Sequence, residues 1–370
     1  MECHIAYADA YTTLGHGEAL WRALVAGRSG LIPAAEAFPG RDFASDTYVG
    51  AIAGLSEQQR MPALLERFAG TIIPDAARAC DFVIGASSLG DLTGPHAGKP
   101  ERLLRAHLGT LFPGLAADRM LVVSSACSSG TDALALAALL LDSGAAHAVG
   151  VLAFDSLEAG KLLQHLALGT QSATRARPFD LQRSGTSFGE GGAFAIVAGA
   201  EGLRRLGLAP IARVAGFGMS CDALDITAPD PTGRWPSRAI QRALASAGDA
   251  ARRIGYINAH GSGTALNDRI EALALREAFG ARLDEIPVSS TKGAVGHLLG
   301  ATGLAELVFA TWALRDGVCP GSVGLETPDP AIDLQVIPAS KVVPGGVPAA
   351  MSVTFGFGGV NSAVVLERAS

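Results

Sequence analysis

The sequence predicts an α/β fold built from two similar halves. Apolar runs of strand length alternate with helical patterns along the 370 residues, and much of the glycine, 46 residues in all, lies in the turns between them. This alternation is typical of α/β proteins. With 49% hydrophobic and 17% charged residues, the chain can also bury a large core.

Two pairs of elements predict the duplication. Residues 121–127 form a predicted strand and turn that lead into an Ala/Leu-rich helix, and residues 287–292 lead in the same way into a helical pattern over 304–314. A Gly-rich element follows each of them. Phe188 begins 64 residues after the first Ser of the first V-S-S, and Phe355 begins 66 residues after that of the second. Near-equal spacing of two distinct elements indicates duplicated halves, which we divide as residues 1–205 and 206–370.

Composition argues against several classes of protein. A net charge of −6 gives no electrostatic reason to expect nucleic acid or an anionic membrane as a partner. The five cysteines are widely spaced, without a Cys-x-x-Cys pair or a Cys/His run that would hold zinc, so we expect free thiols and a cytoplasmic location. The first residues lack the pattern of a signal peptide. The apolar runs are far shorter than the roughly 20 residues that a membrane span requires.

Cys127 is the candidate nucleophile. It lies in the sequence S-S-A-C-S-S-G-T-D between a predicted strand and a predicted helix, where the helix dipole favours a thiolate. A strand-to-helix turn also exposes a side chain, as in a nucleophile elbow. A cysteine beside small residues is often an inert buried thiol, which is our interpretation of the other four. The elements that follow distinguish Cys127 from them.

The sequence N-A-H-G-S-G-T contains His260 after a predicted strand. A histidine among glycines can approach a ligand closely, and Ser262 and Thr264 offer hydroxyl groups to the amides of an extended substrate. Asp268 and Glu271 lie three residues apart on the following predicted helix, where we expect them to brace the loop.

Two further elements are rich in glycine. Residues 289–303 contain Lys292 and His297; because Lys292 precedes the glycines, the order differs from a phosphate-binding loop and disfavours nucleotide binding. The sequence F-G-F-G-G-V-N begins at Phe355. It can present backbone N–H groups to an oxyanion, while Phe355 and Phe357 can close over an apolar chain. A simple core turn is the alternative for this motif alone.

Together, these four motifs resemble the beta-ketoacyl-acyl carrier protein synthases of the thiolase superfamily, specifically the elongating Cys-His-His type. They occur in the family's order, and R-P-F-D at 177–180, G-E-G at 189–191 and T-A-P-D-P at 227–231 are supporting matches. The resemblance is close over residues 120–370 and looser over 14–30. It implies a thiolase-like, five-layered αβαβα fold with two duplicated halves, and no metal or redox cofactor.

The resemblance implies a decarboxylative Claisen condensation. Cys127 would take an acyl group from the phosphopantetheine arm of an acyl carrier protein. His260 and His297 would stabilise the enolate that forms when a malonyl-acyl carrier protein loses carbon dioxide, and the product would be a 3-oxoacyl-acyl carrier protein. Lys292 would fix His297 and the local charge, with Glu306 as support.

The same resemblance implies further roles. The backbone N–H groups of Cys127 and Phe357 would form an oxyanion hole, and Phe355 and Phe357 would form the gate between the acyl and malonyl positions. Ser262 and Thr264 would bind pantetheine. Asn361 would give structural support to its turn.

Three other functions remain as alternatives. A non-catalytic partner subunit, like the chain-length factors, would lack the reactive cysteine that is present here. A degradative thiolase needs a second cysteine near the C-terminus, and the last one here is Cys319. A cysteine hydrolase using Cys127, His260 and Asn258 would not need the Lys292 element or the phenylalanine gate.

Partners follow from the same resemblance. We expect a dimer through the N-terminal halves, formed with a second copy or with a ketosynthase-like subunit. Because acyl carrier proteins are usually acidic, we expect an arginine-lined entrance, with Arg60 and Arg67 as candidates. The stretch before Cys127 is shorter than is usual for the family, which favours a specialised polyketide or polyene pathway over primary fatty acid synthesis.

Overall fold

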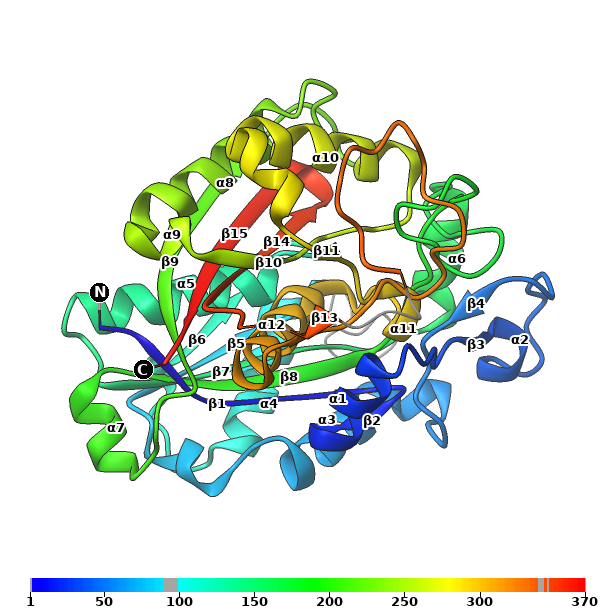
Figure 1. Ribbon diagram of the computed structural model, residues 1–370. Helices are drawn as coiled ribbons and strands as arrows, with labels where there is room; N and C mark the ends of the chain where they lie inside the picture. The colour runs from blue at the N-terminus through cyan, green and yellow to red at the C-terminus, as the bar shows by residue number, and fades with distance from the viewer. Residues whose placement is uncertain (1, 89–98, 339–342, 345, 370) are drawn as a thin grey trace.

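The computed structural model describes residues 2–88, 99–338, 343–344 and 346–369 (Figure 1). The main strands of the first half are β1 (His4–Thr12), β5 (Phe82–Ala86), β6 (Met120–Val123), β7 (Ala148–Asp155) and β8 (Gly191–Ala198). Those of the second half are β9 (Ala212–Cys221), β10 (Ile254–Asn258), β11 (Val288–Ser289), β14 (Ala349–Gly356) and β15 (Val360–Arg368). Short pairs are formed by β2 (Gly15–His16) with β1, β3 (Ile32–Pro33) with β4 (Tyr48–Val49), and β12 (Val318–Cys319) with β13 (Val343–Pro344).

The helices lie between these strands in the sequence. They are α1 (Gly17–Val25), α2 (Ala34–Ala37), α3 (Arg60–Thr71), α4 (Pro100–Leu111), α5 (Ser129–Asp142), α6 (Ala159–Ala167), α7 (Ala200–Leu206), α8 (Arg234–Ala247), α9 (Asp249–Arg252), α10 (Ala265–Phe279), α11 (Lys292–Val295) and α12 (Thr302–Asp316). Short 3-10 turns are η1 (Glu57–Gln59), η2 (Asp75–Ala79), η3 (Ala117–Arg119), η4 (Gly280–Glu285), η5 (Leu299–Ala301) and η6 (Phe357–Gly359). Within the described ranges, every helix is too short or too polar to cross a membrane.

The strand order is the same in the two halves. The hydrogen-bonded path runs β6-β5-β7-β8-β1 and continues as β9-β15-β14-β10-β11. The first three strands from each end of this path run parallel: β6, β5 and β7 in the first half, and β11, β10 and β14 in the second. The other two strands of each half are antiparallel to their neighbours: β8 and β1 in the first half, and β15 and β9 in the second. The halves join where His4 of β1 pairs with Arg213 of β9. The predicted duplication is therefore confirmed. The division between residues 205 and 206 stays a prediction and falls at the end of α7.

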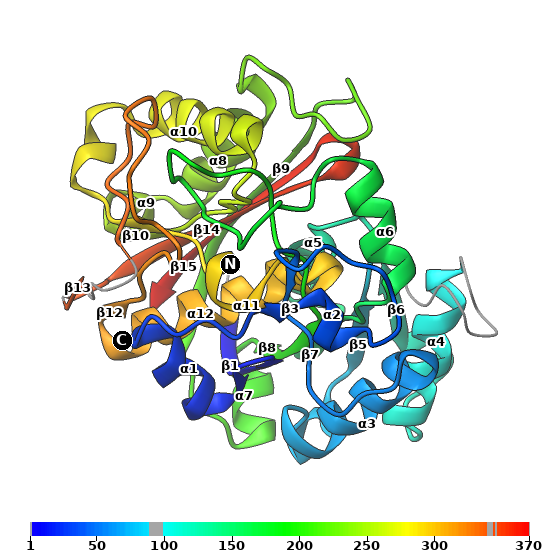
Figure 2. The same ribbon diagram turned by 90° about the vertical axis from the view of Figure 1, so that its right-hand side faces the viewer.

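The elements form five layers (Figure 1). Helices α5 and α12 pack against each other between the strands of the two halves. The view in Figure 2 shows α8 and α10 on the side of the second-half strands, and α3, α4 and α7 on the opposite side. All residues of α12 from Thr302 to Leu314 are buried, as expected for a helix that is apolar all round. The αβαβα architecture expected from the sequence is confirmed.

Two glycines allow the central helices to approach closely. A Cβ atom at Gly130 of α5 would lie 2.7 Å from the backbone nitrogen of Leu304, and one at Gly303 of α12 would lie 2.0 Å from Thr131 Oγ1. Only residues without a side chain fit at this crossing. The crossing fixes the starts of both helices, and both helices begin beside the candidate site.

Candidate active site

Cys127 lies on the turn between β6 and α5. The preceding residue, Ala126, has φ = 53°, a left-handed conformation that non-glycine residues rarely adopt. Neighbouring hydroxyl groups hold this turn: Ser129 Oγ donates to the carbonyl of Ala126 over 2.6 Å, and Ser125 Oγ donates to Asp132 Oδ2 over 2.6 Å. The serines around Cys127 thus maintain the strained backbone that positions the thiol at the N-terminus of α5.

Burial dominates the acidity of the Cys127 thiol. It raises the pKa to about 11, although the backbone N–H groups of Phe357 and of Cys127 itself, together with the charge of Lys292, lower it. The sequence predicted that the helix dipole would favour a thiolate, and burial opposes that effect at this thiol. The thiol therefore carries its proton at neutral pH.

His297 follows the short helix α11 and is a buried, neutral hydrogen-bond donor. Its Nδ1 accepts the backbone N–H of Leu299 over 3.0 Å, so in the neutral ring the proton is on Nε2. Burial, followed by the charges of Lys292 and His165, holds the pKa well below its ordinary value. The ring therefore presents an N–H group rather than a lone pair on its Nε2 side.

His260 follows β10 on a loop that Glu271 of α10 holds. The backbone N–H groups of His260 and Gly261 donate to the two carboxylate oxygens of Glu271, each over 2.7 Å. Burial raises the pKa of Glu271 to about 8, against the effect of these N–H groups. The His260 ring meets that of His297 edge to face with 5.5 Å between centroids. Burial, followed by the charge of Lys292, keeps its pKa well below the ordinary value, so this ring is also neutral.

Lys292 is fully buried and connects two elements behind the histidines. Its Nζ donates to the carbonyl of His260 and to Glu306 Oε1, the latter over 2.6 Å. Burial raises the pKa of Glu306 to about 7, and the charge of Lys292 opposes this rise. The direct contacts of Lys292 are thus with His260 and Glu306, whereas His297 is held by the N–H of Leu299.

The turn at 355–361 closes on the nucleophile. A Cβ atom at Gly356 would lie 3.2 Å from the backbone nitrogen of Cys127, so the turn and the nucleophile nearly touch. Phe355 is buried with its ring 6.0 Å from that of His260. Asn361 Nδ2 donates to Asp222 Oδ1 over 2.6 Å, which ties the end of the turn to the segment after β9.

The remaining predicted residues lie on the loop before α10 and on its first turns. The hydroxyl groups of Ser262 and Thr264 are 2.9 Å apart, and Thr264 Oγ1 accepts the N–H of Asn267 as the N-cap of the helix. Asp268 is buried and accepts the backbone N–H groups of Phe179 and Gly263. Asp268 and Glu271 thus hold the backbone of the loop on which the hydroxyl groups lie.

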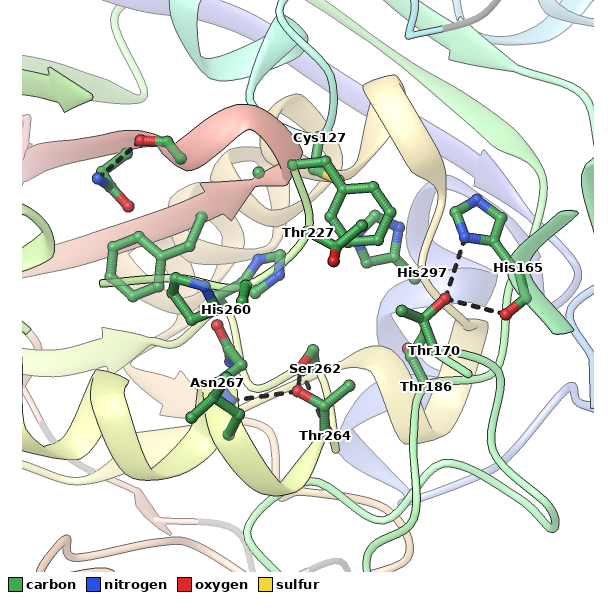
Figure 3. A pocket seen from close by; sticks show the side chains of 18 of the residues that line it. Cys127, His165, Thr170, Thr186, Thr227, His260, Ser262, Thr264, Asn267 and His297 are labelled. Atoms are coloured by element: carbon green, nitrogen blue, oxygen red, sulfur yellow. Dashed lines mark hydrogen bonds between the residues drawn. The ribbon is translucent and has the colours of Figure 1, made fainter. Parts of the chain in front are cut away.

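The side chains meet in a pocket of about 230 Å³. Figure 3 shows Cys127, His260 and His297 close together, with Ser262 and Thr264 on the same pocket. Phe355, Phe357 and Asn361 also line it. Four predicted residues are buried behind this lining and are not part of it: Asp268, Glu271, Lys292 and Glu306.

Sequence reasoning missed one wall of the pocket. His165 of α6 stacks on Phe188 with 3.7 Å between ring centroids and lies 5.7 Å from the ring of Phe357. Its Nδ1 is 3.1 Å from Thr170 Oγ1 (Figure 3). Burial, followed by the charge of Lys161, lowers its pKa to about 4. His165 follows no glycine or strand end, so no local pattern indicated it.

Two sequence-based suggestions are corrected. Arg60 is only 3% exposed and donates to Glu190 Oε2 over 2.7 Å, so it cannot line an entrance. Asn258 is buried with its Nδ2 donating to the hydroxyl of Tyr256, and it does not line the pocket. Arg67 donates to the carbonyls of Ala53 and Gly54 on the first half.

The halves support each other's turns. The N–H of His297 donates to the carbonyl of Ser187 over 2.8 Å, and the N–H of Gly189 donates to the carbonyl of His297 over 2.9 Å. The Gly-rich turn of the first half therefore holds His297 of the second. The Gly-rich turn of the second half lies against Cys127 of the first.

The duplicated five-layered fold and the Cys-His-His pocket define a thiolase-like protein. Two family models match the chain: the N-terminal domain of beta-ketoacyl synthases over residues 116–201 and the C-terminal domain over 211–326. The chain belongs to the beta-ketoacyl synthase family.

Curated relatives carry related names. A 3-oxoacyl-[acyl-carrier-protein] synthase 2 of Coxiella burnetii is 36% identical over 253 residues, which cover 66% of this chain and 61% of that protein. The tetracenomycin polyketide synthase ketoacyl synthase alpha subunit of Streptomyces glaucescens is 38% identical over 263 residues, which cover 67% of this chain and 59% of that protein. The matched region thus spans about three fifths of these relatives' length.

Solved structures share the fold over the full length of the chain. A type II polyketide ketosynthase in complex with its acyl-carrier protein superposes with a TM-score of 0.86 at 22% identity, covering 100% of this chain and 99% of that one. A beta-ketoacyl synthase of Burkholderia phymatum superposes with a TM-score of 0.84 at 23% identity, covering 100% of both chains. The ishigamide ketosynthase/chain length factor gives 0.83 at 20% identity, covering 100% and 99%.

Proposed function

We propose that this chain catalyses a decarboxylative Claisen condensation, in which an acyl group held on Cys127 is joined to a malonyl-acyl carrier protein to give a 3-oxoacyl-acyl carrier protein. One observation carries the proposal: Cys127 and two neutral histidines, His260 and His297, line one pocket, and two backbone N–H groups face the cysteine sulfur. Membership of the beta-ketoacyl synthase family supports the same reaction class.

In the first half-reaction, the Cys127 sulfur attacks the thioester carbonyl of the incoming acyl group. The S–C bond to pantetheine breaks, and the proton of the Cys127 thiol leaves with the pantetheine sulfur. Because burial raises the thiol pKa to about 11, the proton is moved during this step rather than before it. The backbone N–H groups of Cys127 and Phe357 stabilise the tetrahedral oxyanion.

In the second half-reaction, the malonyl thioester loses carbon dioxide and its carbonyl oxygen gains negative charge. N–H groups of His297 and His260 donate to that oxygen while the enolate carbon attacks the acyl-Cys127 carbonyl. The new C–C bond forms, the S–C bond to Cys127 breaks, and the sulfur takes up one proton. Neutral imidazoles suit this role because each ring can donate a hydrogen bond from its N–H group without a change in its own charge.

The supporting residues have roles in the same scheme. Ser262 and Thr264 hydrogen-bond the amides of pantetheine, and Phe355 and Phe357 separate the acyl and malonyl positions. Lys292 orients the loop of His260 by donating a hydrogen bond to the backbone carbonyl of His260. Glu306, Asp268, Glu271 and Asn361 hold the backbone around these groups.

We propose that the partners are an acyl carrier protein and a second subunit, either a copy of this chain or a ketosynthase-like protein. The solved ketosynthase with its acyl-carrier protein, and the ishigamide and ApeO/ApeC ketosynthase/chain length factor pairs, support such partners. A cytoplasmic location is supported by the five cysteines, which are all free thiols. The polyketide relative supports a specialised pathway.

The decisive experiment is mass spectrometry of the Cys127 peptide after incubation with carrier-bound acyl groups of graded length and unsaturation. We expect acylation of Cys127 with one preferred chain, followed by a product two carbons longer when malonyl-acyl carrier protein is added. Free acid in place of the 3-oxoacyl product would indicate a hydrolase. A Cys127 that is never acylated would indicate a non-catalytic subunit of the chain-length-factor type.

A further inference from the structure

Among the described residues that line the pocket, three buried side-chain atoms lack a hydrogen-bond partner: His260 Nδ1, His165 Nε2 and Thr186 Oγ1. His260 already has a role toward the enolate, but the other two have none. His165 and Thr186 are 6% and 3% exposed, and Figure 3 shows them with Thr170 on one side of the pocket. A buried polar atom without a partner costs free energy, which a ligand that supplies the partner recovers. This wall of the pocket is therefore suited to a polar group of the substrate.

Thr170 determines which tautomer His165 adopts. Its Oγ1 donates to the backbone carbonyl of His165 over 3.2 Å and lies 3.1 Å from His165 Nδ1. Because the hydroxyl has one proton and the carbonyl can only accept, Nδ1 donates its own proton to Thr170 Oγ1. Burial, followed by the charge of Lys161, lowers the pKa of His165 to about 4, so the ring is neutral near pH 7. Nε2 therefore presents a lone pair that accepts a hydrogen bond.

Aromatic packing fixes the position of this lone pair. The ring of His165 stacks on that of Phe188, and its centroid lies 5.7 Å from the ring centroid of Phe357. The ring of Phe188 lies in turn 5.5 Å from that of His297. His165 is thus held next to the gate and one ring away from the enolate donor. A polar group that reaches it must lie close to the reacting carbons.

The surroundings of His165 select the kind of group that fits. A hydrocarbon would leave Nε2 unpaired, and a carbonyl or carboxylate oxygen would place lone pairs against it. The charge of Lys161, which disfavours a proton on this ring, also disfavours an ammonium group. The amides of pantetheine are already assigned to Ser262 and Thr264. The remaining donor is a neutral hydroxyl group.

We propose that His165 is a specificity-determining residue whose Nε2 accepts a hydrogen bond from a hydroxyl group of the thioester substrate. This inference rests on the proposed function, because it concerns the acyl and malonyl groups that the pocket would hold. The hydroxyl belongs either to the acyl chain, as in a 3-hydroxyacyl group, or to the extending unit, as in a 2-hydroxymalonyl group. Both sources offer the same neutral donor beside Phe357, which separates the two positions.

The test compares substrates that differ only at the hydroxyl position. In one arm, hexanoyl, 3-hydroxyhexanoyl and 3-methylhexanoyl groups on an acyl carrier protein acylate Cys127. In the other, malonyl, 2-hydroxymalonyl and 2-methylmalonyl groups extend the same acyl-enzyme. Wild type should prefer the hydroxylated substrate of one arm by about tenfold in kcat/KM, with the methyl compound as the control for size. No preference in either arm would mean that water pairs with Nε2, and would overturn the inference.

Variants assign the preference to the ring nitrogen. His165→Phe should remove it, because phenylalanine can still stack on Phe188 but offers no lone pair. His165→Gln should keep part of it, because the amide oxygen can accept from the same hydroxyl. His147→Phe, at an exposed histidine, is the matched control and should keep all of it. A preference that persists in His165→Phe would overturn the role of His165.

The tautomer has its own readout. Nitrogen-15 NMR of the His165 ring should show Nε2 without a proton in wild type and a mixture of tautomers in Thr170→Val, in which the preference should also fall. Thr170→Ser, which keeps the hydroxyl, should restore both. A protonated Nε2 in wild type at neutral pH would contradict the assignment of Nε2 as an acceptor.

Binding without chemistry separates this inference from the proposed function. Pantetheine amides, which cannot acylate Cys127, carry the same hydroxylated and plain groups, and calorimetry gives their Kd values. Tighter binding of the hydroxylated amide to wild type but not to His165→Phe, with no condensation of any thioester, would refute the proposed function and leave the role of His165 standing. Condensation with equal kcat/KM for plain and hydroxylated substrates would do the reverse.

Discussion

The two halves contain the same strained turn, and only one of them carries a nucleophile. Ala126 and Leu299 have nearly equal left-handed φ angles of 53° and 54°. Cys127 follows Ala126 and stands two positions before the first residue of α5. In the same way, Gly300 follows Leu299 and stands two positions before the first residue of α12. Position for position, a glycine in the second half therefore corresponds to the reactive cysteine of the first.

The difference between the halves lies in what precedes the turn. Cys127 follows the first serine of its V-S-S by three residues, whereas Gly300 follows the equivalent serine by eleven. The extra residues of the second half contain Lys292 and His297. A Cβ atom at Gly300 would lie 2.3 Å from the backbone nitrogen of Ser88 and 2.8 Å from Asp155 Oδ2. The turn of the first half thus presents the Cys127 thiol. In the second half, Ser88 and Asp155 of the first half occupy the equivalent space, and the residues before the turn present His297 as a hydrogen-bond donor.

The largest expected effect is loss of the nucleophile. Cys127→Ala should abolish acylation and lower condensation by at least about 10⁴-fold, because Cys127 is the thiol that lines the pocket with the two histidines. Condensation kinetics and intact-protein mass spectrometry measure both. Cys221→Ser, at an exposed thiol, should keep activity. Acyl transfer surviving in Cys127→Ala would show that the nucleophile lies elsewhere.

The second-largest expected effect should distinguish acylation from condensation and show which step depends on His297 of the second half. His297→Ala removes an N–H donor to the enolate, so condensation should fall about 10²–10³-fold while acylation of Cys127 continues. Rapid-quench measurement of acyl-enzyme and product resolves the two steps. His147→Ala, at an exposed histidine, serves as the control. Equal loss of both steps would mean that His297 serves the nucleophile directly.

Thiol acidity gives a third test. With the pKa of Cys127 at about 11, alkylation by iodoacetamide should be slow near neutral pH and rise about 100-fold between pH 7 and pH 9, without a plateau, because the thiolate fraction rises tenfold per pH unit below the pKa. Peptide mass spectrometry over time gives the rates. A plateau at or below about pH 8 would mean that the helix dipole outweighs burial.

The smallest expected effect probes the unused copy of the turn. Gly300→Cys should lower the free energy of unfolding by about 1–3 kcal/mol, because the new side chain overlaps Ser88 and Asp155, and its thiol should not be acylated. Denaturant unfolding and mass spectrometry provide the two measurements. Gly109→Ala on α4, where a Cβ meets nothing within 4 Å, should cost no stability. Acylation at position 300 would contradict the account of the halves.

Local patterns predicted the fold because the duplicated units are local. The strand, turn and helix around Cys127 and around residues 287–314 follow from apolar periodicity and glycine placement, and both are present as β6 with α5 and β11 with α12. The residues predicted for the site also lie in or directly behind one pocket, because each of their motifs follows the end of a strand.

Three features could not be predicted from the chain because they depend on distant residues. His165 reaches the pocket only because α6 packs against Phe188, 23 residues away in the sequence. Burial in the folded chain raises the pKa of Cys127. Arg60, exposed by every local sign, is buried because Glu190 needs a cation.

The reciprocal contacts of the two Gly-rich turns limit how this protein can be divided. Gly189 of the first half bonds the backbone of His297, and Gly356 of the second half closes on Cys127. Cut at residue 205, the first fragment would keep a thiol without enolate donors and the second would keep donors without a thiol. Each fragment would also lose the segment that shapes its own reactive turn. Although the fold repeats, one complete site therefore needs both halves.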